Sequence, residues 1–557
     1  MTDITRLQTR RHVERVLRPW RDAAIPGMTI GVVRDGELVA HGCAGLASLE
    51  LGVPIGPATA FRIASVSKQF TTAAVLMLAA DGRLQLDDDA AMHLPELAQL
   101  GRRVTVAQLM HNTSGIRDML ELMRLGGADL GTPVTAAQIL EAIARQRATN
   151  FAPGSRYLYS NSNFLLLGLI VERISGQSLP EFLRGRIFEP LGMTATRMTP
   201  STLDVVANLA TGYLPAEGGF WRRAPHAFPL GGEGGLVSSV EDLALWACTA
   251  EAGLPGGAAL LAELERIAPF PDGTPNGYAR GLQVGSYRGL RTVSHGGLWP
   301  GYKTQFLRIP ERRLAIIAIS NNGASDPYHA AQDVLDALIE ATPGVHAVPP
   351  SPPPADLARY VGTWLDRATG QTVDFALEQG VLMGRTWGVP FRAVPSADGR
   401  LIASRATSDF ACRLDGDRLE VEADAGIRAT FERAPAQAAL PSDLPGRYAS
   451  EEMEAVWTIA RLHVDLVHKD VMRVRIDGPV ARGAEMVVRP IDGDLVRIVS
   501  ARVLFEAWMD TRVERDAQGR IVALHVDGGR VRGVRFARLR EGETMRRTER
   551  ERLPEPA

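Results

Sequence analysis

Ser65 and Lys68 stand three positions apart at the start of an apolar stretch, within residues 61–70 (FRIASVSKQF). At helical spacing the two side chains lie one turn apart on one face, which places an amine beside a hydroxyl. A serine hydroxyl becomes a good nucleophile only when a neighbouring base takes its proton, and a lysine can be that base only where its surroundings lower its pKa. The pattern indicates catalysis by Ser65 with Lys68 as base. Taken alone, it also fits a helix cap followed by a surface lysine.

Two further motifs carry polar groups suited to such a reaction. Tyr159 and Asn161, separated by one serine, lie in a polar loop before an apolar stretch. A tyrosine there can relay a proton, and an asparagine can hydrogen-bond the lysine and a substrate amide. His295 is followed by Gly296 and Gly297, and glycines let a strand approach a ligand closely. The alternatives are a loop that caps the next helix and a structural histidine.

The hydrophobic pattern predicts the elements that position these residues. Asp35-Gly36 is a strong signal for a two-residue turn between strands. A stretch that is apolar on all sides indicates a buried helix, and short alternating runs indicate strands. We expect a sheet flanked by helices, built from an N-terminal amphipathic helix, a hairpin over 28–39, helices over 68–80 and 163–174, and strands over 303–308 and 314–320.

Proline-rich segments divide the chain, which is too long for one hydrophobic core because cores stop growing near ~250–300 residues. Residues 348–354 (VPPSPPP) favour an extended, semi-rigid linker. After it the helical period gives way to short alternating runs separated by turns, which indicates antiparallel β-domains. Residues 434–441 (APAQAALP) form a weaker boundary between two such domains. The predicted domains are 1–347 (catalytic), 348–354 (linker), 355–436 (first barrel) and 437–557 (second barrel).

Together and in this order, the three motifs resemble those of the serine β-lactamase-like family, which includes class C β-lactamases, DD-peptidases, esterases and D-aminopeptidases. Residues 112–115 (NTSG, with Asn where the family has His) and 188–193 (FEPLGM) extend the resemblance over residues ~10–340. It implies a multidomain α+β protein whose catalytic domain combines an antiparallel sheet with a helical subdomain. It also implies these roles: Ser65 is acylated, Lys68 and Tyr159 transfer protons, Asn161 binds the substrate, and the strand of His295, Gly296 and Gly297 supplies part of an oxyanion hole.

The two β-domains make the resemblance strongest to the bacterial D-aminopeptidases of this family. Residues 362–370 (GTWLDRATG) and 446–452 (GRYASEE) resemble the openings of their two barrels. In those enzymes a loop of the last barrel supplies an acidic residue for the substrate amine, whereas residues 500–508 (SARVLFEAW) here offer only Glu506. The resemblance implies release of N-terminal D-residues from peptides, amides or esters, with barrels that restrict the cleft. The alternatives are an esterase or β-lactamase-like amidase, and a non-catalytic penicillin-binding or sensor protein.

The charge and the cysteine content of the chain limit the kinds of molecule that it is expected to bind. With 62 basic and 64 acidic side chains the net charge is −2, which gives no overall field for nucleic acid or an anionic membrane. Cys43, Cys248 and Cys412 lack the spacing of a metal site or a disulfide framework. We therefore expect a small peptide, amide or ester substrate and no metal or other cofactor. We also expect a cytoplasmic location, because no secretory signal is visible. The resemblance adds inhibition by β-lactams and a homodimer.

Overall fold

The computed structural model describes residues 3–21, 23–224, 226–249, 257–339, 345–347, 354–386, 389–396, 398–403, 410–423, 427–464, 469–500 and 508–545. Two compact units divide the chain, and neither is continuous in sequence. Unit 1 holds residues 1–95, 103–114 and 163–348, and unit 2 holds residues 96–102, 115–162 and 349–557. Residues 115–162, which lie inside the predicted catalytic domain, thus pack with the β-domains. Residues 348–353 of the predicted linker lie outside the described residues.

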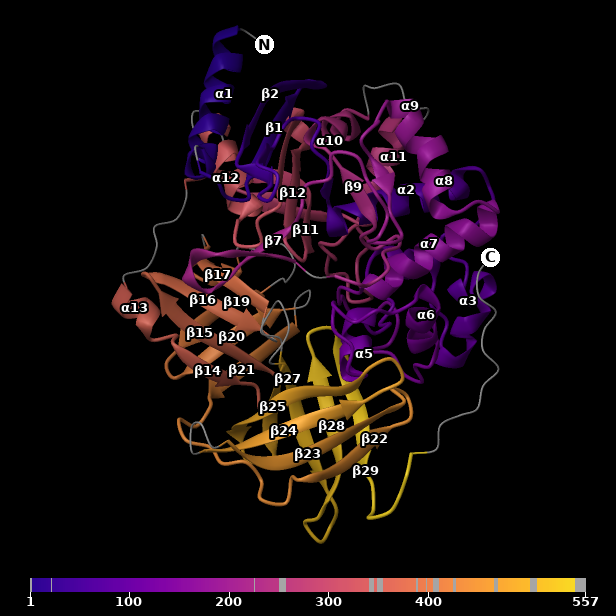
Figure 1. Cartoon of the computed structure of the whole chain (residues 1–557), viewed down its shortest axis with the longest axis vertical. Coiled ribbons are helices and arrows are strands. Elements are labelled where there is room, and N and C mark those ends of the chain that lie inside the picture. Colours follow the sequence, from indigo (N-terminus) through magenta and orange to yellow (C-terminus); the bar gives the residue numbers. More distant parts are fainter. Residues whose placement is uncertain are drawn as a thin grey trace. The chain divides into compact units, whose positions relative to one another are not determined.

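A six-stranded antiparallel sheet forms the centre of unit 1, in the order β10-β11-β12-β13-β1-β2 (Figure 1). The predicted hairpin of β1 and β2 is confirmed, since Asp35 and Gly36 have φ 53 and 81 and supply the positive φ that its two-residue turn needs. The strands are β1 (Met28–Arg34), β2 (Glu37–Ala44), β10 (Gln283–Tyr287), β11 (Leu290–Trp299), β12 (Tyr302–Ile309) and β13 (Leu314–Ser320).

Helices cover both faces of this sheet because successive residues of its strands point to opposite sides. On one face, α1 (Asp3–Leu17) and α12 (Pro327–Ile339), which are labelled beside β1 in Figure 1, share a hydrophobic core with Ile30. On the other face, a Cβ on Gly31 would come within 2.6 Å of Val240 in α10 (Val240–Ala247), so glycine lets this helix approach.

The predicted buried helices are confirmed as α2 (Lys68–Ala80) and α7 (Asn161–Ser175). The other helices and short strands before the barrels are α3 (Ala90–His93), α4 (Val106–Met110), α5 (Met119–Leu125), α6 (Ala136–Ala144), α8 (Leu179–Leu183), α9 (Glu189–Leu191), α11 (Gly257–Leu264), β3 (Leu46–Ser48), β4 (Val53–Pro54), β5 (Phe61–Arg62), β6 (Arg197–Met198), β7 (Tyr213–Pro215), β8 (Trp221–Arg223) and β9 (Leu236–Ser238).

The two predicted β-domains are confirmed as closed antiparallel barrels of eight strands each. The first, which follows α13 (Pro354–Ala358), has a core that includes the rings of Phe375, Phe391 and Phe410. In the second, Trp457 stacks on Phe536 with ring centroids 4.2 Å apart. The first barrel comprises β14 (Gly362–Leu365), β15 (Thr372–Glu378), β16 (Val381–Thr386), β17 (Val389–Pro395), β18 (Leu401–Ala403), β19 (Phe410–Asp415), β20 (Arg418–Ala423) and β21 (Ile427–Arg433). The second comprises β22 (Gly446–Ser450), β23 (Ala455–Val464), β24 (Lys469–Asp477), β25 (Arg482–Asp492), β26 (Leu495–Ser500), β27 (Trp508–Arg515), β28 (Ile521–Gly528) and β29 (Val531–Arg538).

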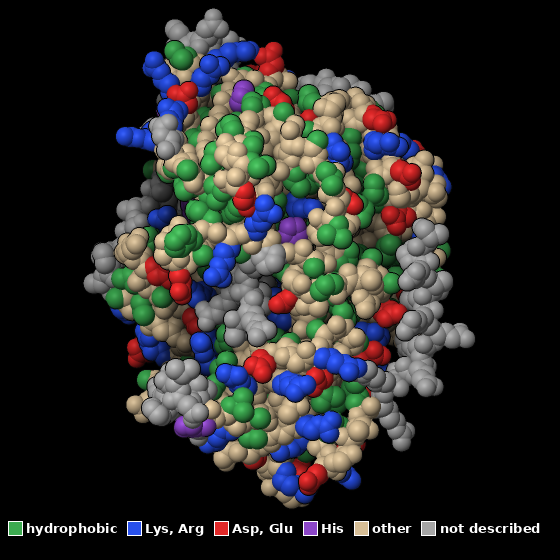
Figure 2. Space-filling model, viewed as in Figure 1, with side chains coloured by type: hydrophobic (Ala, Val, Ile, Leu, Met, Phe, Trp, Pro, Cys, Tyr) green, Lys and Arg blue, Asp and Glu red, His purple; other side chains and the backbone are tan. Residues whose placement is uncertain are grey.

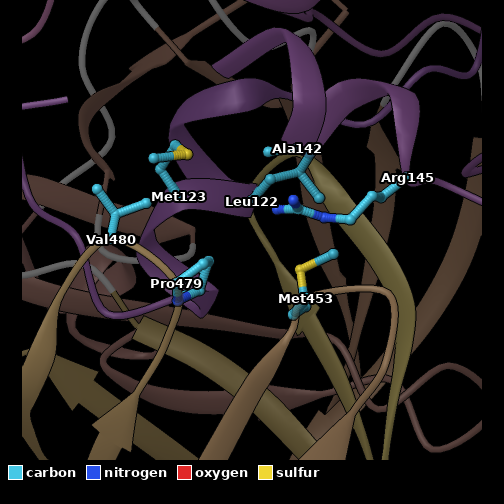
Figure 3. Close-up of a pocket in the computed structure, with 8 residues that line it drawn as sticks. Leu122, Met123, Ala142, Arg145, Met453, Pro479 and Val480 are labelled. Atoms are coloured by element: carbon cyan, nitrogen blue, oxygen red, sulfur yellow. The ribbon is translucent and has the colours of Figure 1, made fainter. Parts of the chain in front are cut away.

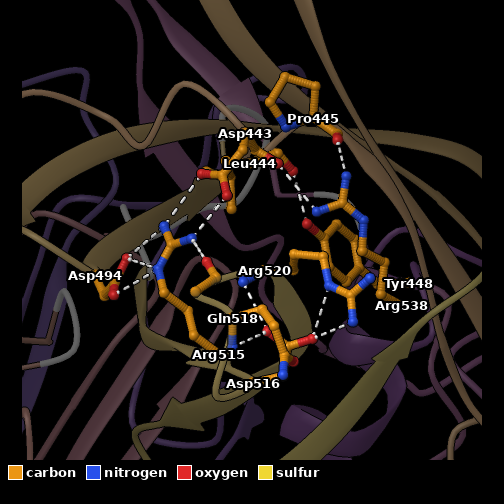
Figure 4. A network of polar contacts seen from close by, with 11 residues as sticks. Asp443, Leu444, Pro445, Tyr448, Asp494, Arg515, Asp516, Gln518, Arg520 and Arg538 are labelled. Carbon is orange, nitrogen blue, oxygen red and sulfur yellow. Dashed lines mark hydrogen bonds and ion pairs between the residues drawn. The ribbon is translucent and has the colours of Figure 1, made fainter.

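A polar network fixes the chain where it enters the second barrel (Figure 4). Arg515 pairs with Asp443 at 2.7 Å and with Asp494 at 2.8 Å. Arg538 donates hydrogen bonds to the backbone carbonyls of Asp443 and Pro445, at 3.0 and 2.9 Å. These contacts join the segment before β22 to strands β27 and β29, near the place where β22 and β29 pair to close the barrel.

Helices α5 and α6 pack against the second barrel within unit 2. Trp457 donates a 3.0 Å hydrogen bond to the carbonyl of Leu125 at the end of α5. A Cβ on Gly478 would lie 1.9 Å from the carbonyl oxygen of Gly126, so the two backbones are in close contact. A small cavity remains at this junction (Figure 3), lined by Leu122, Met123, Gly126, Ala142, Arg145, Met453, Pro479 and Val480.

The surface carries charges of both signs. On the face shown in Figure 2, basic and acidic side chains are interspersed over most of the molecule, in agreement with the net charge of −2. Within the described part of the chain, no helix is long and apolar enough to cross a membrane.

Candidate active site

Ser65 and Lys68 lie side by side at the start of α2. Ser65 belongs to the 3-10 turn η2 (Ala64–Ser67) and is partly exposed, whereas Lys68 is fully buried. Lys68 Nζ donates a 3.1 Å hydrogen bond to Ser65 Oγ and a 2.6 Å hydrogen bond to the backbone carbonyl of Glu233. Ala64 has φ 49, a left-handed conformation that is strained for a residue with a Cβ and that is found at functional turns. Lys68 is thus no surface lysine, and its amine faces the hydroxyl.

Strand β11 runs against the turn that holds Ser65. β10 pairs with β11 over 290–294, whereas β12 pairs with it on the other side as far as Trp299. Beyond Ser294, therefore, β11 can present one edge to the turn. A Cβ on Gly297 would lie 2.2 Å from the carbonyl oxygen of Ile63, two residues before Ser65. Only glycine permits this approach of β11 to the backbone of Ile63, whereas the predicted approach of Gly296 and Gly297 to a ligand stays a prediction.

His295 is buried as a neutral imidazole. Its Nδ1 lies 2.6 Å from the carbonyl oxygen of Gly296, and its Nε2 lies 3.0 Å from the hydroxyl of Tyr278. The neutral tautomer that suits both contacts donates from Nδ1 and accepts from the tyrosine at Nε2. Burial of the imidazole lowers the pKa of His295 to about 3. The histidine therefore suits a role in holding β11 in place better than a role as an acid.

The stretch 112–115 is tied to the start of α7. Asn163 donates from its Nδ2 to Asn112 Oδ1 at 2.8 Å and accepts from the hydroxyl of Ser114 at 2.7 Å. Asn112 has φ 55, and asparagine tolerates this left-handed conformation better than most residues. Asparagine therefore suits the position where the family has histidine.

Tyr159 and Asn161 belong to unit 2, where a buried carboxylate holds their motif. Asp118 Oδ2 accepts hydrogen bonds from the backbone N–H of Asn161 at 2.6 Å and from its Nδ2 at 2.9 Å. The same carboxylate caps α5 through the N–H of Leu120 at 3.0 Å. Arg530, from the turn between β28 and β29, lies 3.3 Å from Asp118 and 5.7 Å from the ring centroid of Tyr159.

Comparison with known proteins places this arrangement in a family. A model of the family described as Beta-lactamase matches residues 10–341. The chain belongs to the serine β-lactamase family. A D-aminopeptidase of Brucella anthropi is 31% identical over 435 residues, which are 77% of this chain and 80% of that protein. A D-aminopeptidase of Cereibacter sphaeroides is also 31% identical, over 452 residues, with the same coverage. The resemblance to D-aminopeptidases within this family is thus confirmed.

A solved structure shares the fold. The octameric penicillin-binding protein homologue from Pyrococcus abyssi superposes with a TM-score of 0.56 at 22% identity, and the match covers 77% of this chain and all of that one. The predicted fold class, a β-lactamase-like catalytic domain followed by two barrels, is confirmed.

One predicted site residue lies in a part of the chain that the structure does not describe. Glu506, predicted to bind the substrate amine, lies in residues 501–507, outside the described residues. Among the residues that the structure describes, no group of three or more His, Cys, Asp or Glu side chains could hold a metal ion.

Two residues that hold the Tyr159 and Asn161 motif within unit 2, Asp118 and Arg530, were not predicted from the sequence. Asp118 carried a weak signal, because an aspartate before an apolar run is typical of a helix cap. Arg530 carried no signal in the sequence, because it lies in a turn of the second barrel. Its partner Asp118 belongs to segment 115–162, which is far away in the sequence.

Proposed function

We propose that this member of the serine β-lactamase family is a D-aminopeptidase in which Ser65 is the nucleophile and Lys68 its base. The observation that carries the proposal is the buried Lys68 amine, 3.1 Å from the Ser65 hydroxyl. Burial disfavours the charged form of an amine, and the neutral form can accept a proton. The curated D-aminopeptidases at 31% identity supply the substrate class.

The proposed reaction proceeds through an acyl-enzyme. Ser65 Oγ attacks the carbonyl carbon of the terminal D-residue while its proton passes to Lys68. Backbone N–H groups of Ser65 and of the strand at Gly297 bind the oxyanion. The C–N bond then breaks as the leaving amine takes the proton from Lys68, with Tyr159 as relay. Water next attacks the ester carbonyl, the C–O bond to Ser65 Oγ breaks as that oxygen regains a proton, and the D-amino acid is released. The roles of Tyr159 and Asn161 rest on the resemblance of their motif to that of the family.

Turnover of three substrates by the purified chain tests the proposal: D-alanine p-nitroanilide, its L-enantiomer and p-nitrophenyl acetate. We expect the D-amide to be cleaved much faster than the L-amide. Ser65→Ala should lower turnover of the D-amide and of the ester by at least ~10³-fold, because the nucleophile is lost. The fold should survive, since losing a helix-start serine costs only about 1 kcal/mol.

Other results of these assays would favour one of the alternative functions or contradict the nucleophile assignment. Hydrolysis of the acetate ester without cleavage of D-amides would indicate an esterase or a β-lactamase-like amidase. Acylation by a penicillin without turnover of any substrate would indicate a penicillin-binding or sensor protein. Activity of Ser65→Ala within about tenfold of the parent would contradict the nucleophile assignment.

Four further predictions belong to the same proposal. Inhibition by β-lactams is tested by preincubation with penicillin, and the homodimer by light scattering. The cytoplasmic location is tested by fractionation of cells that express the chain. The domain boundaries 1–347, 348–354, 355–436 and 437–557 are tested by limited proteolysis, which should cut first near the proline-rich segment.

A further inference from the structure

The turn between β28 and β29 is anchored to the segment that carries Tyr159. The carbonyl of Arg530 accepts hydrogen bonds from the N–H of Asp118 at 3.3 Å and from Asn150 Nδ2 at 3.1 Å. The N–H of Arg532 donates to Asn150 Oδ1 at 2.8 Å. Backbone contacts on both sides of this turn thus set the position of the Arg530 side chain.

The guanidinium of Arg530 neutralises two buried carboxylates. Its Nη1 lies 3.3 Å from Asp118 Oδ2, and its Nη2 lies 3.7 Å from Glu121 Oε1. The two acidic side chains are 0% and 7% exposed. Burial acts to lower the pKa of Arg530, but the charges of Asp118 and then Glu121 outweigh it, so that the pKa is raised. Arg124 adds a second cation at Glu121, at 2.5 Å, whereas Asp118 is the carboxylate that also holds Asn161.

One oxygen atom connects this arginine to the motif. Asp118 Oδ2 faces Arg530 and accepts both hydrogen bonds from Asn161. The guanidinium also lies 5.7 Å from the ring centroid of Tyr159, within the range of a cation–π interaction. Removal of the cation would leave the buried Asp118 carboxylate near Glu121 without its counter-ion, which costs free energy. A shift of the carboxylate that relieves this cost would disturb the acceptor of both hydrogen bonds from Asn161.

We propose that Arg530 is a positioning residue for Tyr159 and Asn161, so that the second barrel takes part in catalysis by setting the geometry of this motif. The proposal rests on the function proposed above for the two motif residues. It goes beyond the expectation that the barrels only restrict the cleft, because it assigns a task to one barrel side chain.

An ion pair elsewhere at the same junction provides a matched control. Arg117 pairs with Glu452, which precedes β23, and the two side chains are 4% and 16% exposed. This pair also joins segment 115–162 to the second barrel. Glu452→Gln should therefore weaken the junction as Arg530→Gln does, without removing the cation beside Asp118 and Tyr159.

The test compares Arg530→Gln, Arg530→Lys and Glu452→Gln in the full chain, by kcat and KM for D-alanine p-nitroanilide and by the thermal midpoint. We expect Arg530→Gln to lower kcat at least ~10-fold, because a charge-assisted contact to a buried carboxylate is lost, and to raise KM, because Asn161 binds the substrate. Arg530→Lys should recover much of kcat, since it restores the charge. Glu452→Gln should lower the midpoint to a similar extent and leave kcat within about threefold.

The proposal is overturned if Arg530→Gln keeps kcat within about threefold while its midpoint falls as in Glu452→Gln, because the contact would then be structural only. It is also overturned if Arg530→Lys is as inactive as Arg530→Gln at an unchanged midpoint. If the parent cleaves no D-amide, the proposed substrate fails, and the same comparison is made with p-nitrophenyl acetate. Ester turnover that survives Ser65→Ala would overturn both proposals.

Discussion

Mild acid should destabilise unit 1, because two of its histidines are buried as neutral imidazoles. Burial lowers the pKa of His111 to about 4 and that of His295 to about 3, and the two residues are 4% and 2% exposed. In an unfolded chain the pKa of histidine is about 6.5. Above pH 6.5 both residues are neutral whether or not the chain is folded, so their contribution to stability is intact. Below pH 6.5 only the unfolded chain takes up the protons, and stability is lost as the pH falls toward the folded pKa values.

The size of the effect follows from the two pKa differences. Each pH unit over which only the unfolded chain is protonated costs about 1.4 kcal/mol per histidine. Between pH 6.5 and 5 this amounts to about 2 kcal/mol for each residue and about 4 kcal/mol for both. Each kcal/mol of lost unfolding free energy lowers the thermal midpoint by about 2–4 °C, so the midpoint of unit 1 should fall by about 8–16 °C. Burial also lowers the pKa of His226 to about 4, so this histidine adds to the loss of stability in acid. Burial raises the pKa of Asp242, and this carboxyl group therefore reduces the loss.

Thermal unfolding at pH 7, 6 and 5 measures this effect in the parent, in His111→Asn and in His41→Asn. An asparagine at position 111 keeps a donor for the carbonyl of Tyr278, which lies 3.2 Å from the imidazole Nδ1, but it does not titrate. The shift between pH 7 and 5 should therefore be about 4–8 °C smaller in His111→Asn than in the parent. The exposed His41 serves as the control and should leave the shift unchanged. Equal shifts in all three proteins would refute the reasoning.

Four further predictions concern close contacts and the chemistry of the proposed reaction. Gly297→Ala should lower kcat/KM for D-alanine p-nitroanilide at least ~100-fold, because the new Cβ would lie 2.2 Å from the carbonyl oxygen of Ile63. In Gly296→Ala the nearest atom to the new Cβ would be 3.4 Å away, and kcat/KM for the same substrate should stay within about tenfold of the parent. Gly478→Ala should lower the thermal midpoint by several degrees, because the new Cβ would lie 1.9 Å from the carbonyl oxygen of Gly126, and an unchanged midpoint would contradict that packing. Lys68→Ala should lose nearly as much activity as removal of the nucleophile, and a loss of only about twofold would point to another base. EDTA should leave turnover unchanged, and restoration of lost activity by a divalent ion would refute a metal-free reaction.

The sequence predicted those features that depend on local pattern. The hairpin of β1 and β2 followed from Asp35-Gly36 between alternating residues, and α2 followed from its uninterrupted apolar run. The barrels followed from the change of hydrophobic period after the proline-rich segment. Ser65 and Lys68 were found for the same reason, because one helical turn brings them together whatever the rest of the chain does.

Features that depend on contacts between distant parts of the chain could not be predicted from local sequence patterns. Asp118 and Arg530 are joined by an ion pair, and the carbonyl of Arg530 bonds to Asn150, 380 residues earlier in the chain. An arginine in a β-turn, viewed alone, is an ordinary solvent-exposed residue. Only the pairing of β28 with β29, and the packing of their turn on segment 115–162, gives this side chain a buried partner.

Asp118 links the Tyr159 and Asn161 motif to the second barrel within unit 2. A fully buried carboxylate is stable only when it is paired or hydrogen-bonded, and the cation near Asp118 Oδ2 comes from the second barrel. Segment 115–162 also depends on that barrel through Trp457, which satisfies the carbonyl of Leu125. We therefore expect the Tyr159 and Asn161 motif to reach its final geometry after β28 and β29 have folded, because Arg530 then neutralises Asp118. A barrel that only narrowed a cleft would impose no such order, because the motif would then be complete without it.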